Sequence, residues 1–360
     1  MSMCIKSDVS LLLRRLETAG YFVNYGLLGD GNFRPYDWEK MAGLLTGDFQ
    51  ELWRFFLLGG RLSSTRLREL LGGAAFDCLM ELNVCQSRNR EVTLGSLSLV
   101  SYRGNTFLVD RGNSPRAYFG DDTKALMTLL PKREQGQCLC LYSNSSVAML
   151  PLASRSQIQI TYACGPHNGE LVEANLRLNN AGAAPRFQPR PAVRDSGKYD
   201  VIVAACPSTF EPPGIKMPAP IAAGRDGLKY LKELLAQGSR LLSAEGCLLT
   251  TFLYFSEADS QIMREQLARL IEPHGLGYRL VICSKHLMQP GVPVFNMLFG
   301  LATAGRADAA EATAKKMLKH VRTMKFEAAY LIKGKFLPAA ASAPREIIDY
   351  SDTYYGSWTF

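Results

Sequence analysis

The sequence predicts a three-layer α/β fold with a seven-stranded sheet, preceded by a small helical domain. From residue 137 onward, apolar runs of strand length alternate with runs of helical periodicity, which is typical of a parallel sheet covered by helices. Before that point, several helical runs lead into short stretches of alternating polarity with turn residues between them. These patterns divide the chain into residues 1–112, 113–330 and 331–360.

The first region is predicted to be a winged-helix-like domain. Helices are expected at 7–20, 35–45, 48–58, 64–71 and 74–82, and short strands at 91–94, 97–102 and 106–109. Such a domain either binds DNA or serves as a packing or substrate-gating domain of an enzyme. A DNA-recognition helix carries clustered basic residues. Residues 64–71 offer only Arg66 and Arg68, beside Glu69, which favours the packing domain.

The second region is predicted to form the sheet and its helices. Strands are expected at 138–142, 157–163, 200–204, 247–255, 278–283 and 295–301, and helices at 147–153, 170–178, 226–242, 257–271 and 309–321. The turn-rich residues 112–115 before it indicate a hinge. In such a sheet the loops at the carboxyl ends of the strands form the ligand crevice, so we expect the functional site there.

Two segments carry a resemblance to a known family. Gly224-Arg225-Asp226-Gly227-Leu228 precedes a helix, and Asp122-Thr123-Lys124-Ala125-Leu126 precedes the first strand. Together with the order of elements over residues 116–303, they resemble the class I S-adenosylmethionine-dependent methyltransferases, in the bacterial branch near the release-factor glutamine methyltransferases. The resemblance implies a Rossmann-like, methyltransferase-type sheet, with Arg225 and Asp226 as substrate-binding residues.

The cofactor site that the resemblance implies has changed in this chain. The positions that match the family's pocket are Cys140, Tyr142, Ser143, Asn144, Ser146 and Cys164. Cys140 and Cys164 stand where the family has acids, and Asn144 and Ser146 stand where it has loop glycines. A buried polar group left without its partner costs about 1–3 kcal/mol. The sequence therefore predicts a degenerate site, with S-adenosylmethionine as the implied but disfavoured cofactor.

The motif that holds the substrate nitrogen in the family, Asn-Pro-Pro-aromatic, falls on Ala205-Cys206-Pro207-Ser208. Only Pro207 is kept. Cys206, Pro207 and Ser208 are therefore the candidate catalytic positions of a degenerate motif. Glutamine methylation by the family's mechanism is not expected.

Three cysteines, Cys140, Cys164 and Cys206, are expected near one edge of the sheet, and His167 follows Cys164 in Cys-x-x-His spacing. Such a set can hold zinc or supply a reactive thiol beside an imidazole. The alternative is that these cysteines pack as small apolar residues. Because the sequence has no Cys-x-x-Cys pair, it predicts no metal site.

The composition is that of an ordinary globular protein, with 360 residues, 47% hydrophobic residues and a net charge of +8 spread along the chain. No apolar run reaches the roughly 18 residues that a membrane helix needs. The first residues lack a secretory signal pattern, and the nine irregularly spaced cysteines are typical of a reducing compartment. We expect a cytoplasmic protein for which nucleic acid is a disfavoured partner.

Two function classes follow from these patterns. The favoured class is a bacterial pseudoenzyme with a methyltransferase fold, either an accessory or binding subunit or an enzyme of other chemistry, with specialised-metabolite biosynthesis as one setting. The alternative is an active S-adenosylmethionine-dependent methyltransferase that acts on a small molecule or a protein side chain. In both classes a small-molecule ligand is expected in the crevice.

The last region, residues 331–360, is expected to hold a strand, at 329–336, and an aromatic-rich tail. The aromatic residues of this tail are Tyr350, Tyr354, Tyr355, Trp358 and Phe360. Such a tail either packs on the body or contacts a protein partner.

Overall fold

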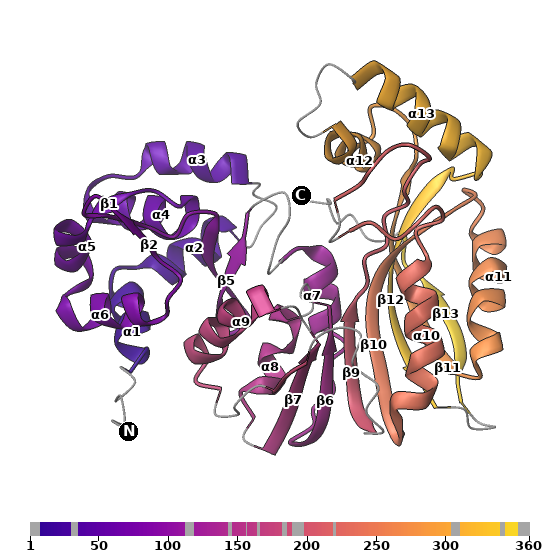
Figure 1. The fold of residues 1–360 in the computed structure, drawn as a ribbon, viewed down its shortest axis with the longest axis horizontal. Coiled ribbons are helices and arrows are strands. Elements are labelled where there is room, and N and C mark those ends of the chain that lie inside the picture. Colours follow the sequence, from indigo (N-terminus) through magenta and orange to yellow (C-terminus); the bar gives the residue numbers. More distant parts are fainter. Residues whose placement is uncertain are drawn as a thin grey trace.

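The computed structural model describes residues 8–29, 35–111, 119–142, 146–155, 157–163, 166–181, 186–188, 198–218, 221–303, 310–338 and 343–351. Within these residues, a mainly helical N-terminal part leads into a large sheet with helices on both faces (Figure 1). None of the helices in the described ranges combines the length and the apolar character that a membrane crossing requires.

The N-terminal part contains helices and two small sheets. Its helices are α1 (Ser10–Thr18), α2 (Tyr21–Gly29), α3 (Pro35–Leu44), α4 (Gly47–Leu58), α5 (Ser64–Leu71) and α6 (Gly73–Glu81). Its strands are β1 (Leu62–Ser63), β2 (Gln86–Arg88), β3 (Glu91–Thr93), β4 (Leu97–Tyr102) and β5 (Asn105–Asp110). One sheet has the order β1-β3-β2, and β4 and β5 form a separate antiparallel ribbon.

Local sequence explains how α5 and the β2–β3 hairpin form. The Ser63 side chain accepts a hydrogen bond from the Arg66 N–H at 3.1 Å, which caps the start of α5. Asn89 and Arg90 connect β2 to β3 with φ angles of 54° and 66°. Two successive positive φ angles are typical of the tight turn that suits the twist of a hairpin.

The central sheet has eight strands in the described residues, in the order β13-β11-β12-β10-β9-β6-β7-β8. Their bounds are β6 (Gln135–Leu141), β7 (Gln157–Ala163), β8 (Arg186–Gln188), β9 (Tyr199–Ala205), β10 (Leu242–Ser256), β11 (Gly277–Leu287), β12 (Ala328–Leu337) and β13 (Arg345–Asp349). The run from β8 to β10 is parallel, whereas β12 is antiparallel to both β10 and β11. Strand β13 pairs in parallel with β11 at the edge. Neither β8 nor β13 is predicted from the sequence, and one predicted strand is a helix, so the sheet has one strand more than the seven expected.

The strand predicted at residues 295–301 is a helix, so that prediction is wrong. Helix α12 (Pro293–Thr303) covers the segment, and its buried residues Val294, Phe295, Leu298 and Ala302 recur at helical spacing. A short apolar run does not distinguish a strand from a buried helix, whereas Pro293 at the first position favours a helix. The strand predicted at residues 329–336 is β12, which lies between β10 and β11.

Helices cover both faces of the sheet. One face packs against α7 (Asp121–Met127), α8 (Leu150–Ala153) and α9 (Pro166–Leu178), in a buried cluster that continues into the N-terminal helices. The other face packs against α10 (Lys229–Leu241) and α11 (Ser260–Ile271). The sheet is therefore the middle layer of three.

A third buried cluster lies beside the sheet and joins α12 to α13 (Ala310–Thr323). Figure 1 shows these two helices together at one end of the molecule, on the side away from α1–α6. Phe210, in the segment after β9, lies in this cluster with Phe255 and Phe326, at ring-centroid distances of 4.9 and 5.2 Å. This packing fixes the segment between β9 and α10.

Candidate functional site

The strand order defines where a ligand crevice can lie. From β6 the chain proceeds outward through β7 to β8, and from β9 it proceeds in the opposite direction to β10. Strands β6 and β9 are parallel neighbours, so the connections that leave their carboxyl ends diverge. In open α/β sheets ligands bind at such a topological switch point. The candidate site is therefore the carboxyl end of β6 and β9, called the switch-point crevice below.

Tyr142 is the first residue after β6 and lies at this switch point. Its φ angle is 70°, in the left-handed region that bulky residues rarely adopt. The side chain is only 7% exposed. Its ring meets the Tyr230 ring edge-on, with centroids 5.7 Å apart, and its hydroxyl lies 3.5 Å from the Tyr230 main-chain oxygen.

The cysteines Cys140 and Cys206 do not converge. Cys140 of β6 pairs with Val203 of β9. Cys206 comes three residues after Val203, which displaces it by about 10 Å along the strand, at a rise of about 3.3 Å per residue. Cys140 also belongs to the buried cluster on the α7–α9 face, whereas Cys206 belongs to the cluster on the α10–α11 face. Both thiols are buried. The structure therefore separates these two thiols too far for a shared metal ion.

The side chains of the candidate catalytic motif hold β9 against β10. The Cys206 N–H donates to the Thr251 carbonyl oxygen at 3.2 Å, and the Thr250 hydroxyl donates to the Cys206 sulfur at 3.6 Å. The Ser208 hydroxyl oxygen accepts a hydrogen bond from the Leu253 N–H at 2.8 Å. Pro207 between them is buried. The hydroxyl and thiol groups therefore have structural partners at the positions where we expected catalytic groups.

The Gly224–Leu228 segment is a tight turn before α10. Gly224 and Gly227 have φ angles of 78° and 75°, and a side chain at Gly227 would place its Cβ 2.8 Å from the Ser208 carbonyl oxygen. Glycine is therefore required at position 227 for close packing against the strand end after β9. Arg225 is exposed on the turn.

Asp226 stabilises the start of α10. Its carboxylate accepts a hydrogen bond from the Leu228 N–H at 2.9 Å and pairs with the Lys232 ammonium at 2.6 Å. Burial opposes ionisation, but these two donors outweigh it, and the pKa of Asp226 lies below its ordinary value. Of the two predicted substrate-binding residues, only Arg225 keeps an exposed charged group.

His320 is a residue of this region that no sequence pattern singles out. It lies on α13, is 4% exposed, and its Nε2 is 2.9 Å from the Arg225 carbonyl oxygen. Because a carbonyl oxygen only accepts, Nε2 carries the proton. The ring packs against Phe210 and Phe326, and burial lowers the pKa of His320 below its ordinary value. His320 thus connects helix α13 to the Gly224–Leu228 turn by a hydrogen bond.

Asp122 brings a carboxylate to the side of the sheet that α7 covers. It lies in the first turn of α7, which packs against the short helix η2 (Val147–Met149). Its carboxylate accepts a hydrogen bond from the Thr123 N–H at 2.7 Å. Burial, with repulsion from Asp121, nevertheless raises the pKa of Asp122 to about 6. A carboxylic acid that titrates near neutrality is a candidate proton donor or acceptor.

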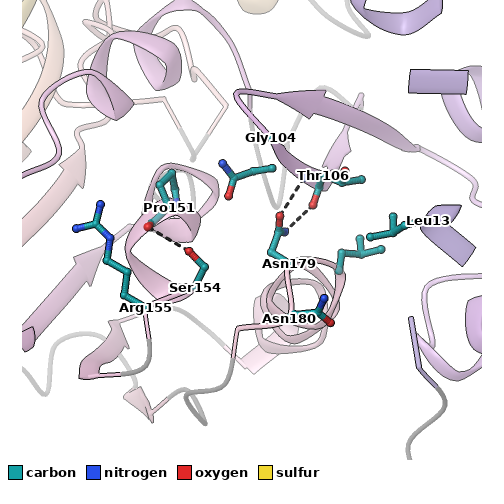
Figure 2. A pocket seen from close by; sticks show the side chains of 10 residues that line it. Leu13, Gly104, Thr106, Pro151, Ser154, Arg155, Asn179 and Asn180 are labelled. Carbon is teal, nitrogen blue, oxygen red and sulfur yellow. Dashed lines mark hydrogen bonds between the residues drawn. The ribbon is translucent and has the colours of Figure 1, made fainter. Parts of the chain in front are cut away.

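A separate groove lies between α8, α9 and the β4–β5 ribbon, with a volume of about 510 Å³ (Figure 2). It adjoins the ends of α8 and α9 that lead into β7 and β8, so it lies at the amino ends of the strands, away from the switch-point crevice. Several of its polar groups already have protein partners. Asn179 binds the Thr106 main chain, the Ser154 hydroxyl donates to Pro151, and the Arg155 guanidinium donates to the Arg133 carbonyl oxygen.

The basic residues of α5 are also engaged by protein groups. Arg66 pairs with Glu51 and Asp48 at 2.9 and 2.6 Å. Arg68 pairs with Asp77 at 2.6 Å and lies over the Phe76 ring. These contacts neutralise the two positive charges that this helix offers.

Several predicted site residues lie outside the described residues. These are Ser143, Asn144, Cys164 and the side chain of His167. Ser146 is described and is buried at the start of η2. In the part of the chain that the structure describes, no three His, Cys, Asp or Glu side chains gather closely enough to hold a metal ion.

Comparisons with known proteins yield matches among solved structures only. No protein-family model matches the chain, and no curated protein matches it by sequence. A tRNA m1G37 methyltransferase from M. jannaschii aligns at 11% identity and a TM-score of 0.37, covering 71% of this chain and 59% of that enzyme. A putative transferase from Pyrococcus horikoshii aligns at 8% identity and a TM-score of 0.39, with coverages of 86% and 100%.

The [4+2]-cyclase SpnF is also similar to this chain, at 15% identity and a TM-score of 0.37, with coverages of 61% and 80%. This chain thus spans less than two thirds of the M. jannaschii enzyme and the whole of the P. horikoshii transferase. At such scores the class of the protein is defined by its own strand order: an α/β protein with a large, mostly parallel central sheet.

Proposed function

We propose that this protein is a methyltransferase-fold pseudoenzyme whose switch-point crevice does not bind S-adenosylmethionine in the usual pose. In this proposal it acts as an accessory or binding subunit, or as an enzyme of other chemistry on a small molecule. The sheet order supports the fold assignment. In class I methyltransferase sheets one antiparallel strand lies between two strands of the otherwise parallel sheet, as β12 lies between β10 and β11 here. Strand β13 is an addition to that arrangement.

The observation that carries the proposal is the chemistry of the strand ends. Cys140, Tyr142, Ala163 and Cys206 occupy the described ends of β6, β7 and β9, and all four are buried. None of them is a carboxylate, so none can accept the hydrogen bonds of a ribose or an amino group as an acid does. A ligand with those groups buried there would lose about 1–3 kcal/mol for each group left unpaired.

Isothermal titration calorimetry with S-adenosylmethionine tests the proposal on the full chain. We expect no binding at millimolar ligand, and the same result with S-adenosylhomocysteine, which lacks the transferable methyl group. A dissociation constant in the micromolar range for either compound would overturn the proposal. It would restore the alternative, an active methyltransferase that acts on a small molecule or a protein side chain.

The N-terminal part is proposed to be a winged-helix-like packing domain. The order β1-β3-β2, with α4 before β1 and α5 and α6 between β1 and β2, supports this assignment. Helix α6 carries Asp77 and Glu81 and no basic residue, which disfavours contact with DNA phosphates. An electrophoretic mobility assay at low salt should show no shift of duplex DNA, and a shift at micromolar protein would contradict the packing role.

A protein partner is proposed for the C-terminal aromatic segment. Tyr350 follows β13 and is 52% exposed, whereas the other aromatic residues lie beyond the described residues. Large exposed aromatic side chains are enriched at protein interfaces. Deleting residues 350–360 should abolish a complex formed by the full chain without unfolding the rest of the chain. An unchanged complex would reject this role.

A further inference from the structure

We propose that the outer edge of strand β13 pairs with the same edge of a second copy of this chain, so that two sheets join across a twofold axis at Ile347. The main-chain groups of this edge are open, and its charges match those of a second copy in one antiparallel register. The inference is independent of the switch-point crevice, because β11, β12 and β10 separate β13 from β9 in the sheet.

Strand β13 uses only every second residue to bond with β11. The Tyr278 N–H donates to the Pro344 carbonyl oxygen at 2.6 Å, and the Tyr350 N–H donates to the Ile282 carbonyl oxygen at 3.0 Å. In this parallel ladder the even-numbered residues of β13 therefore face β11. The N–H and C=O groups of the odd-numbered residues point away from the sheet, and no other strand in the described part of the chain pairs with them. These residues are Arg345, Ile347 and Asp349.

The charges on this edge suit a second copy of the same edge. Charged residues often protect a strand edge from pairing, because unmatched charges oppose it. Arg345 is exposed and has no ion-pair partner among the described residues. Asp349 accepts a hydrogen bond from the Ser351 N–H at 2.9 Å and pairs with Arg264 at 3.4 Å, and its two oxygens keep further lone pairs for a second guanidinium. The edge therefore has an open cation at one end and a carboxylate at the other.

One antiparallel register matches these charges. When Ile347 faces Ile347 of the partner subunit, Arg345 faces the partner's Asp349, and each outward-facing residue belongs to a pair that exchanges both of its N–H···O bonds. Side chains of directly opposed residues lie on the same face of a sheet, so the opposite charges meet twice. Sliding one strand by two residues brings Glu346 opposite the partner's Glu346, where like charges repel, or leaves Arg345 opposite the partner's Ser351.

The same register covers apolar side chains that the single chain exposes. Ile348 and Tyr350 are 37% and 52% exposed, and Tyr350 lies opposite the partner's Pro344. Each chain contributes one short strand, which is less than a standard protein interface provides. We therefore expect a reversible dimer with a dissociation constant of about 1–100 μM.

Sedimentation velocity of the full chain at several concentrations tests the proposal with two pairs of variants. Ile347→Pro removes an outward N–H that β11 does not use, and proline is tolerated at such a position of an edge strand. Ile347→Ala loses the same side-chain packing but keeps the N–H, so it is the matched control. Arg345→Asp places two carboxylates opposite each other, and Arg345→Lys keeps the positive charge. Circular dichroism establishes that each variant is folded, and the exposed position 345 keeps the test decisive if Ile347→Pro does not fold.

We expect Ile347→Ala and Arg345→Lys to dimerise within about fivefold of the wild-type dissociation constant, and Ile347→Pro and Arg345→Asp to raise it at least about tenfold. A wild type that stays monomeric at about 300 μM would overturn the proposal. A dimer that neither Ile347→Pro nor Arg345→Asp weakens would lie on another surface and would also overturn it. Weakening by Ile347→Pro alone would overturn the register. All four variants leave residues 350–360 unchanged, so they test the strand edge separately from the aromatic segment.

Discussion

The side-chain amide of Asn175 makes both of its hydrogen bonds with the main chain of one residue, Leu108. The Leu108 N–H donates to Asn175 Oδ1 at 2.6 Å, and Asn175 Nδ2 donates to the Leu108 carbonyl oxygen at 3.0 Å. One turn later, directly after the end of α9, Asn179 repeats the arrangement with the main chain of Thr106, at 3.0 and 2.6 Å. Two side-chain amides thus form hydrogen bonds with the edge of β5 that a neighbouring strand would otherwise form.

Replacing Asn175 with alanine should destabilise the protein strongly. Asn175 is 2% exposed, so Asn175→Ala leaves a buried N–H and a buried carbonyl group without partners. Each such group costs about 1–3 kcal/mol. We expect the free energy of unfolding, measured by urea denaturation, to fall by about 2–4 kcal/mol. The exposed neighbour Glu173 on the same helix supplies the control, and Glu173→Ala should change the value by less than about 0.5 kcal/mol.

The two glycines of the Gly224–Leu228 turn should respond differently to alanine. Both have positive φ, so each substitution costs about 1 kcal/mol from the backbone alone. At Gly224 the nearest atom to an added Cβ is 3.6 Å away, an ordinary contact, whereas at Gly227 the Ser208 carbonyl oxygen is 2.8 Å away. Gly227→Ala should therefore lose about 2 kcal/mol more than Gly224→Ala in thermal or urea unfolding. Equal losses would show that the clash with Ser208 is absent in solution.

His320 should make stability depend on pH below about 6.5. Burial lowers its pKa below the ordinary value of 6.5, so in this range the unfolded chain binds a proton that the folded chain does not. Stability from the neutral imidazole is therefore present above pH 6.5 and is lost as the pH falls below it. His320→Phe keeps an aromatic ring between Phe210 and Phe326 but cannot titrate. Its unfolding free energy, measured at several pH values, should fall less steeply on acidification, and an identical slope would contradict the assignment.

Asp122 should have the opposite effect on the pH dependence. Burial raises its pKa from 3.8 to about 6, so the folded chain holds this proton more tightly than the unfolded chain. The associated stability is present below pH 3.8 and is lost as the pH rises through about 6. Asp122→Asn removes that loss and should raise the unfolding free energy at pH 7.5. Because the residue as a whole is half-buried, we expect a gain of about 1 kcal/mol, less than the full shift corresponds to.

The same variant provides its own control at low pH. At pH 4 the wild-type Asp122 is protonated in the folded protein, so the difference between the two proteins should shrink toward zero. A constant difference at both pH values would indicate a packing effect and not a titration.

Local patterns in the sequence were sufficient for most elements of the fold. Helix α5 begins and ends where predicted, because Ser63 caps it and its apolar residues recur at helical spacing. Strand β7 also matches its predicted bounds, Gln157–Ala163. The sequence predicts a strand at residues 295–301, where the structure has a helix, because a short apolar run has no unique period. The short strands β1 and β2 were missed, because their residues are mostly exposed and form strands only by pairing with β3.

The candidate site was predictable in position and not in chemistry. Strand alternation predicts a site at the carboxyl ends of the strands, and Tyr142 and Cys206 lie at those ends. The sequence also placed Cys140 and Cys206 together, whereas the β6–β9 register separates them. The left-handed backbone of Tyr142 had no local signal, because tyrosine is not a residue type that favours positive φ.

The sequence by itself determined the order and type of most elements, because capping residues and hydrophobic periodicity act over a few residues. The tertiary structure alone decided that β12 enters the sheet antiparallel between β10 and β11, and that His320 meets Arg225, 95 residues away. It likewise brought Tyr142 to Tyr230 across 88 residues. Such contacts depend on the order of the strands and on which side chains the fold buries. A contact between two distant segments produces no hydrophobic periodicity in the sequence of either segment.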